Sequence, residues 1–201
     1  MDAARVRDNL ARVRERIGPE VEVCAAIKYV AADDLPTLAE AGIELVGENR
    51  AQDLVAKQDR HGDLFTWDFI GALQSRKVKD VAPRVRLIHS VASDSALRRL
   101  ESVPATDVLV QVNVAGEDSK EGIPPPELGA FIGRCPVPVA GLMTMPPFAE
   151  DPEESRPYFA RLAELAAEHG LERLSMGTSQ DYEVAVQEGA TIVRLGSVLY
   201  G

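Results

Sequence analysis

Eight short apolar runs, separated by segments of helical periodicity, recur along the whole chain and constrain its fold more than any other feature. The runs cover residues 21–27, 43–46, 65–70, 85–91, 107–114, 137–143, 171–175 and 191–195. Near-continuous apolar strands are typical of parallel sheets that helices cover on both faces. The alternation therefore predicts an α/β fold, a (β/α)8 barrel of the TIM type, rather than an open doubly wound sheet.

The segments between the runs carry helix signals. In residues 151–170 the apolar positions repeat at helical spacing, and the resulting stripe is expected to pack on a sheet. Residues 1–18 have an amphipathic pattern that predicts an extra N-terminal helix, which we expect to close one end of the barrel. Left-handed helix ends are expected at Gly42, Gly62, Gly170 and Gly189.

Length and charge limit the classes of function. A chain of 201 residues lies at the lower limit for this barrel, so a single domain spanning residues 1–201 is expected. The net charge of −10 argues against broad contact with nucleic acid or an anionic membrane. No apolar run approaches the ~20 residues of a membrane span, and Cys24 and Cys135 fit reduced thiols. We expect a soluble cytoplasmic protein.

Polar residues gather at the ends of the last two predicted strands. The segment SMGTS (residues 175–179) offers a glycine and three hydroxyls, and RLGS (residues 194–197) offers a glycine, a hydroxyl and a cation. Loops after strands seven and eight commonly bind phosphate in these barrels, so the two segments fit a phosphate site. SMGTSQD also fits a plain helix start capped by Ser179, and spacing alone leaves both interpretations open.

Lys28 ends the first predicted strand and has two interpretations. Its amine can point across the barrel mouth toward whatever the phosphate site holds, and there it can form a Schiff base with an aldehyde. A nearby cation such as Arg194, together with partial desolvation, would favour the neutral nucleophilic amine. The alternative is an ordinary solvated lysine at the end of a strand.

Several motifs together resemble the pyridoxal phosphate homeostasis protein family, whose single-domain barrels are similar to the N-terminal barrel of alanine racemase. The resemblance runs from the N-terminal helix to the C-terminus and is specific only in combination. The motifs are AAIKYV, GENRAQDLVAK, WDFIGALQSRK, IHSV, GLMTMPP and LSMGTSQDYEVAVQEGATIVRLGSVLYG.

The resemblance implies that Lys28 holds pyridoxal 5′-phosphate (PLP) as an internal aldimine and that Arg194 faces the pyridine nitrogen. Because an arginine does not readily give up a proton, the ring nitrogen would stay unprotonated and the cofactor would be a poor electron sink. Asn49 would lie near the aldimine or the ring substituents. The phosphate would be held by Ser175, Gly177, Thr178, Gly196 and Ser197.

Two departures from the family pattern affect the site. Ala72 stands where the family commonly has a histidine in an IGHLQS-type motif, so a role carried by that histidine is in doubt. Lys28 lies in IKYV rather than in the frequent SKTK, which changes its surroundings. His89, in IHSV, fits either an acid–base group or a buried, hydrogen-bonded histidine.

The expected function is that of a monomeric PLP carrier or regulator without catalysis, which keeps the free aldehyde low and passes the cofactor to PLP-dependent apo-enzymes. The alternative is an amino acid racemase that uses the same aldimine. Racemisation needs a base on each face of the substrate, and neither Tyr29 nor Tyr200 can be assigned as the second base. A third possibility is a cofactor-free sugar-phosphate lyase or isomerase with a Schiff-base lysine. No metal site is expected.

Overall fold

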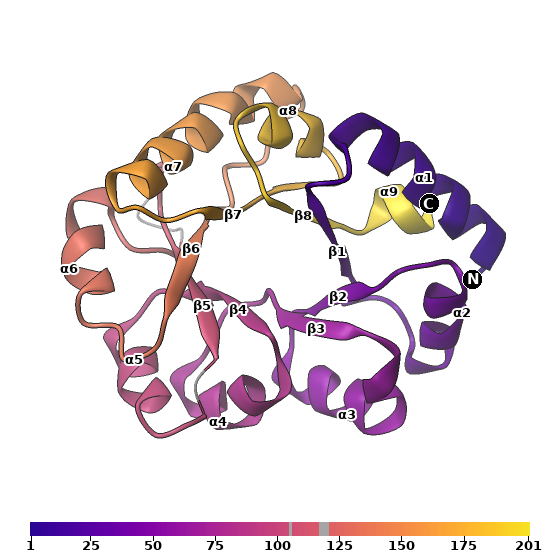
Figure 1. The fold of residues 1–201 in the computed structure, drawn as a ribbon, viewed down its shortest axis with the longest axis horizontal. Coiled ribbons are helices and arrows are strands. Elements are labelled where there is room, and N and C mark those ends of the chain that lie inside the picture. Colours follow the sequence, from indigo (N-terminus) through magenta and orange to yellow (C-terminus); the bar gives the residue numbers. More distant parts are fainter. Residues whose placement is uncertain (105, 117–120) are drawn as a thin grey trace.

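The structure is a computed structural model that describes residues 1–104, 106–116 and 121–201, and it contains the predicted barrel (Figure 1). Eight parallel strands in the described residues pair in chain order, and β1 closes the barrel against β8. The strands are β1 (Glu22–Ala26), β2 (Leu45–Glu48), β3 (Thr66–Phe69), β4 (Leu87–Val91), β5 (Asp107–Gln111), β6 (Val139–Met143), β7 (Arg173–Thr178) and β8 (Ile192–Leu195).

Helices surround the barrel, as the predicted alternation requires (Figure 1). They are α1 (Ala3–Ile17), α2 (Leu35–Glu40), α3 (Ala51–His61), α4 (Val78–Val81), α5 (Asp94–Leu100), α6 (Leu128–Ile132), α7 (Arg156–Glu168), α8 (Tyr182–Gln187) and α9 (Ser197–Tyr200). Short 3-10 turns are η1 (Ala32–Asp34), η2 (Gly62–Leu64), η3 (Ser75–Lys77), η4 (Ala82–Arg84), η5 (Pro125–Glu127) and η6 (Pro152–Ser155).

Two apolar clusters stabilise this arrangement. The larger one joins the outward-facing strand residues to the helices, and includes Leu54 of α3 and Phe159 of α7, both fully buried. The smaller one joins side chains from six different strands, which can meet only inside the barrel: Cys24, Leu45, Leu87, Leu109, Met143 and Ile192. The barrel is thus a packed core, and only its ends are open to a ligand.

The N-terminal helix differs in position from the expectation. Instead of closing one end of the barrel, α1 lies at the periphery beside α2, α8 and α9 (Figure 1). Its buried residues Val6, Leu10, Val13 and Ile17 follow a single helix face. The helix after β8, α9, spans only four residues, and α1 packs beside it.

Three of the four expected left-handed helix ends are present. Gly42, Gly170 and Gly189 have φ of 89°, 64° and 94°. Gly62 does not, because its φ of −57° continues the chain directly from α3 into the η2 turn.

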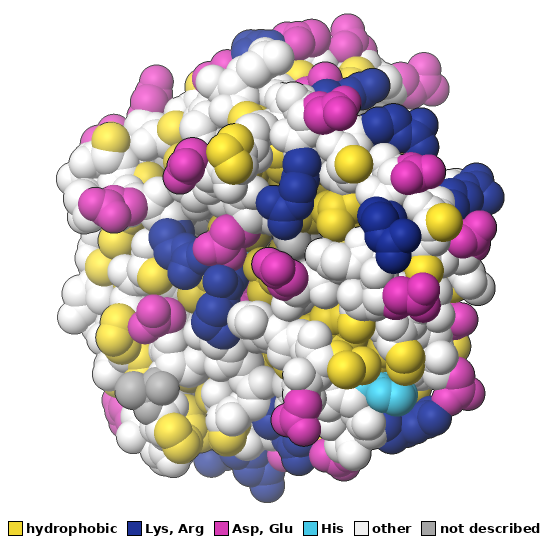
Figure 2. Space-filling view, turned by 45° about the vertical axis from the view of Figure 1, so that its right-hand side comes forward, with side chains coloured by type: hydrophobic (Ala, Val, Ile, Leu, Met, Phe, Trp, Pro, Cys, Tyr) yellow, Lys and Arg dark blue, Asp and Glu magenta, His cyan; other side chains and the backbone are white. Residues whose placement is uncertain are grey.

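The surface mixes charges of both signs. Figure 2 shows acidic and basic side chains interspersed over the face that it displays, with small groups of hydrophobic side chains between them. On that face the net charge of −10 is therefore not concentrated into one broad acidic field. Among the described residues, no helix has both the length and the apolar character that a membrane span requires.

Candidate functional site

A cavity of about 630 Å³ lies at the C-terminal ends of the strands, where barrels of this type carry their functional groups. Residues at the ends of β1, β2, β3, β5, β6, β7 and β8 contribute to its lining. Six of the eight predicted site residues line it: Lys28, Asn49, Thr178, Arg194, Gly196 and Ser197.

Lys28 follows β1 with its side chain exposed at the cavity. Its Nζ lies 4.7 Å from the centre of the Tyr29 ring, a distance at which a cation and an aromatic face attract each other. A hydrogen bond of 3.0 Å from the Val30 N–H to the Ile27 carbonyl closes the turn that carries both residues. The amine is therefore accessible to an incoming aldehyde.

Arg194 is buried on β8, at the floor of the same cavity. Its guanidinium donates to Ser175 Oγ at 2.5 Å, to the Thr144 carbonyl at 2.9 Å and to Met145 Sδ at 2.8 Å. No carboxylate among the described residues forms an ion pair with it. Burial lowers the pKa of Arg194 to about 10, which still leaves a protonated cation at neutral pH.

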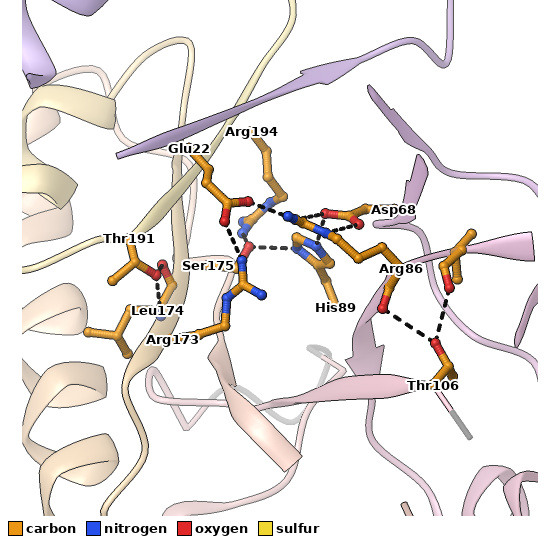
Figure 3. A network of polar contacts seen from close by, with 11 residues as sticks. Glu22, Asp68, Arg86, His89, Thr106, Arg173, Leu174, Ser175, Thr191 and Arg194 are labelled. Atoms are coloured by element: carbon orange, nitrogen blue, oxygen red, sulfur yellow. Dashed lines mark hydrogen bonds and ion pairs between the residues drawn. The ribbon is translucent and has the colours of Figure 1, made fainter. Parts of the chain in front are cut away.

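Beneath the cavity a polar network crosses the barrel interior (Figure 3). Ser175 Oγ lies 2.8 Å from His89 Nδ1, and His89 Nε2 lies 3.1 Å from Asp68 Oδ2. Burial lowers the pKa of His89, and the Asp68 carboxylate only partly opposes this shift. Of the two interpretations left open for His89, the structure has the buried, hydrogen-bonded one.

The network continues to the opposite end of the barrel through ion pairs (Figure 3). Arg86 donates to both carboxylate oxygens of Asp68, at 3.1 and 2.7 Å, and also to Glu22 at 2.7 Å. Glu22 in turn pairs with Arg173. Burial alone would raise the pKa of Asp68, but the hydrogen bonds from His89 and Arg86 lower it overall. Asp68 is therefore an ionised carboxylate at neutral pH.

Hydroxyl and backbone N–H groups converge where β7 and β8 end. Ser179 Oγ accepts hydrogen bonds from the N–H groups of Gly196, at 2.9 Å, and Val198, at 3.3 Å, at the start of α9. Thr178 donates from both its N–H and its hydroxyl to Asp181, at 2.7 and 3.0 Å. Ser179 is thus close to the expected phosphate-binding groups. From the sequence alone, SMGTSQD fits a plain helix start capped by Ser179 equally well.

Two predicted phosphate-site residues are not part of the cavity lining. Ser175 lies inside the barrel, where its hydroxyl bonds to Arg194 and His89. Gly177 has a φ of 90°, and a Cβ there would lie 2.6 Å from the Ala185 Cβ on α8. The register between β7 and β8 shifts between Ser175 and Thr178, so the regular alternation of side chains is interrupted there. Gly177 consequently faces the outer helix.

Two buried polar atoms support a polar ligand in this cavity. Asn49 Oδ1 and the Tyr200 hydroxyl have no hydrogen-bond partner in the described structure, and both residues line the cavity. Burial raises the pKa of Tyr200, so its hydroxyl stays protonated and can donate. Buried polar groups are nearly always paired in proteins, so these two fit contact with a bound molecule. The sequence places Tyr200 near the pocket but does not indicate that its hydroxyl binds the ligand.

Comparison with known proteins identifies similar sequences that match nearly the whole chain. The sequence model of the family described as "Alanine racemase, N-terminal domain" matches residues 1–201. A curated relative from Aquifex aeolicus, named pyridoxal phosphate homeostasis protein, is 41% identical over 218 residues, which cover 98% of this chain and 95% of the relative.

Solved structures show a close likeness as well. PipY of Synechococcus elongatus without PLP is 32% identical, has a TM-score of 0.90, and the match covers 98% of this chain and 100% of that one. The structure of the same protein with PLP bound has a TM-score of 0.86 at the same identity and coverage.

Proposed function

The chain belongs to the alanine racemase N-terminal domain family and to its pyridoxal phosphate homeostasis proteins, and from this we propose that it binds PLP in the cavity at the barrel mouth. PipY, solved with PLP bound, supports the choice of ligand. The observation that carries the proposal is that an exposed lysine amine and a buried arginine line one cavity, Lys28 at its edge and Arg194 at its floor.

We assign each part of the ligand to residues of the cavity lining according to their chemistry. Lys28 would hold PLP through its amine, because the aldehyde that the cofactor supplies can condense with a lysine amine and release water. Arg194 would donate to the ring nitrogen, and Asn49 would lie beside the ring. Ser179 and Ser197 offer hydroxyl donors to the phosphate. Thr178 and Gly196 lie beside them, but their donors bond to Asp181 and Ser179 in this structure and would have to change partner to bind the phosphate. Ser175 and Gly177 support this site from behind rather than by contact.

We further propose that the protein is a PLP carrier or regulator rather than a catalyst. Arg194 is protonated at neutral pH and has only donors, so it cannot supply a proton-accepting partner to a protonated ring nitrogen. The exposure of Lys28 at the cavity edge suits exchange of the aldehyde with an amine or a PLP-dependent apo-enzyme. We expect the carrier to act as a cytoplasmic monomer, and we expect pure protein not to racemise amino acids.

The test of binding is the visible absorption spectrum of the purified protein titrated with PLP. We expect a long-wavelength Schiff-base band in the wild type, its loss in Lys28→Ala, and its retention in Lys79→Ala, which removes an exposed lysine outside the cavity. No band in the wild type would overturn the proposal. A band that persists in Lys28→Ala would move the attachment to another lysine.

A further inference from the structure

A buried ion pair lies next to the cavity without lining it. Lys57 of α3 and Glu48 at the end of β2 are 7% and 0% exposed, and Lys57 Nζ lies 2.5 Å from Glu48 Oε2. Lys57 Nζ also donates to the Ile27 carbonyl at 2.7 Å. The lysine is enclosed by protein groups and takes no part in the cavity surface.

Each end of this pair holds a backbone segment that carries a proposed site residue. The Ile27 carbonyl that binds Lys57 is the same one that closes the turn bearing Lys28. Glu48 Oε1 accepts from the N–H groups of Asn49, at 2.6 Å, and Arg50, at 3.2 Å. The pair therefore connects the end of β1 to the end of β2 and fixes the start of α3.

Stability does not account for such a pair. Removing two charges from water costs about as much as their attraction returns, and a well-packed apolar pair of similar volume is often equally stable. What an apolar pair cannot supply is a set of directed hydrogen bonds to the Ile27 carbonyl and the Asn49 N–H. The geometry around the two site residues is thus the property that depends on these particular side chains.

We propose that Glu48 and Lys57 are positioning residues that fix the exits of β1 and β2 so that Lys28 and Asn49 meet the ligand in one geometry. The inference rests on the proposed function, since the ligand that Lys28 and Asn49 meet is PLP. Lys57 acts through the backbone of the Lys28 turn and does not itself contact the ligand.

The test is PLP titration of Lys57→Met, with the pH midpoint of the absorption band as a second readout. We expect the affinity to fall by about tenfold or more and the midpoint to shift, because small displacements of a reacting group have large effects. Leu100→Ala on α5 creates a cavity on the opposite side of the barrel from β1 (Figure 1) and serves as the destabilised control. We expect it to keep wild-type affinity and midpoint.

A double variant covers the case in which Lys57→Met fails to fold because Glu48 is left as an unpaired buried charge. In Glu48→Gln/Lys57→Met no such charge remains and the amide oxygen can still accept from Asn49, but the bond to Ile27 is lost. We expect the same loss of affinity. Wild-type affinity in either folded variant, or an equal loss in Leu100→Ala, would overturn the proposal.

Hydrogen exchange separates this inference from the proposed function. If the wild type binds no PLP, the function fails, but the positioning role is still tested in the unliganded protein. We expect the Val30, Asn49 and Arg50 amides to exchange faster in Lys57→Met, whereas the Ile88 amide on β4 keeps its wild-type rate. Unchanged exchange at all three amides would show that the pair positions nothing.

Discussion

Arg194 Nη1 donates a hydrogen bond of 2.5 Å to Ser175 Oγ, and this serine joins the floor of the cavity to His89. Arginine has only donors, so the serine oxygen must accept from it. The serine O–H then has His89 Nδ1, 2.8 Å away, as its acceptor. The ionised Asp68 carboxylate can only accept, so the proton of the neutral His89 is on Nε2, directed at Asp68 Oδ2, and Nδ1 can accept from the serine. A neutral imidazole in one tautomer thus connects the floor of the cavity to the ion pairs below it.

The first prediction concerns stability in mild acid. Burial lowers the pKa of His89 in the folded protein, whereas the unfolded chain keeps the ordinary value of about 6.5. The unfolded state therefore binds the proton first as the pH falls, and stability is lost between about pH 6.5 and the lower folded value. In this window the free energy of unfolding is expected to fall by about 1.4 kcal/mol for each pH unit. Urea unfolding at several pH values across this window measures it.

His89→Gln removes the titrating group and should remove this slope, while His169→Gln, which changes an exposed histidine, should keep it. A wild-type free energy of unfolding that stays constant from pH 7 to 5 would mean that His89 is not held neutral. Nitrogen NMR of the ring reports the same property directly, because the Nε2–H tautomer has a distinct pair of shifts.

The second prediction concerns Gly177 and uses Gly189 as its control. Both have φ near 90°, so an alanine at either position carries a backbone cost of about 1–2 kcal/mol. At Gly177 the new Cβ also lies 2.6 Å from the Ala185 Cβ and 3.0 Å from the Tyr182 Cα, whereas at Gly189 its nearest contact is 3.8 Å away. We expect Gly177→Ala to be less stable than Gly189→Ala by about 1–3 kcal/mol, measured by urea unfolding. Equal losses would show that α8 moves away freely.

The barrel could be predicted because burial imposes periodicity on the sequence. Strands covered on both faces read as apolar runs, and each of the eight runs overlaps a strand of the closed sheet. The position of α1 could not be predicted in this way, since an amphipathic pattern shows which face is buried but not against what. In the structure the partner at this point is the four-residue helix α9 that follows β8.

The candidate site could be predicted where a residue lies at a strand end, as Lys28 and Arg194 do. The sequence could not show that Ser175 and Gly177 lie outside the cavity lining, because local backbone geometry and distant partners decide this. The register shift in β7 directs Gly177 outward, and no single-sequence pattern reveals it. Ser175 is turned inward by partners that are 86 and 19 residues away. Such distant pairings follow from the closed barrel and not from any motif.

The third prediction concerns the Tyr200 hydroxyl, which is buried at the cavity without a hydrogen-bond partner in the described structure. Tyr200→Phe keeps the ring and loses no described bond, so the Tm of the unliganded protein should change little. If the hydroxyl binds the ligand, the PLP dissociation constant should rise roughly fivefold, which corresponds to about 1 kcal/mol for one hydrogen bond. Tyr158→Phe, which makes the same deletion on α7 away from the cavity, should bind PLP as the wild type does. Fluorescence or absorption titration of the three proteins measures the difference, and an unchanged dissociation constant in Tyr200→Phe would place this hydroxyl outside the ligand contacts.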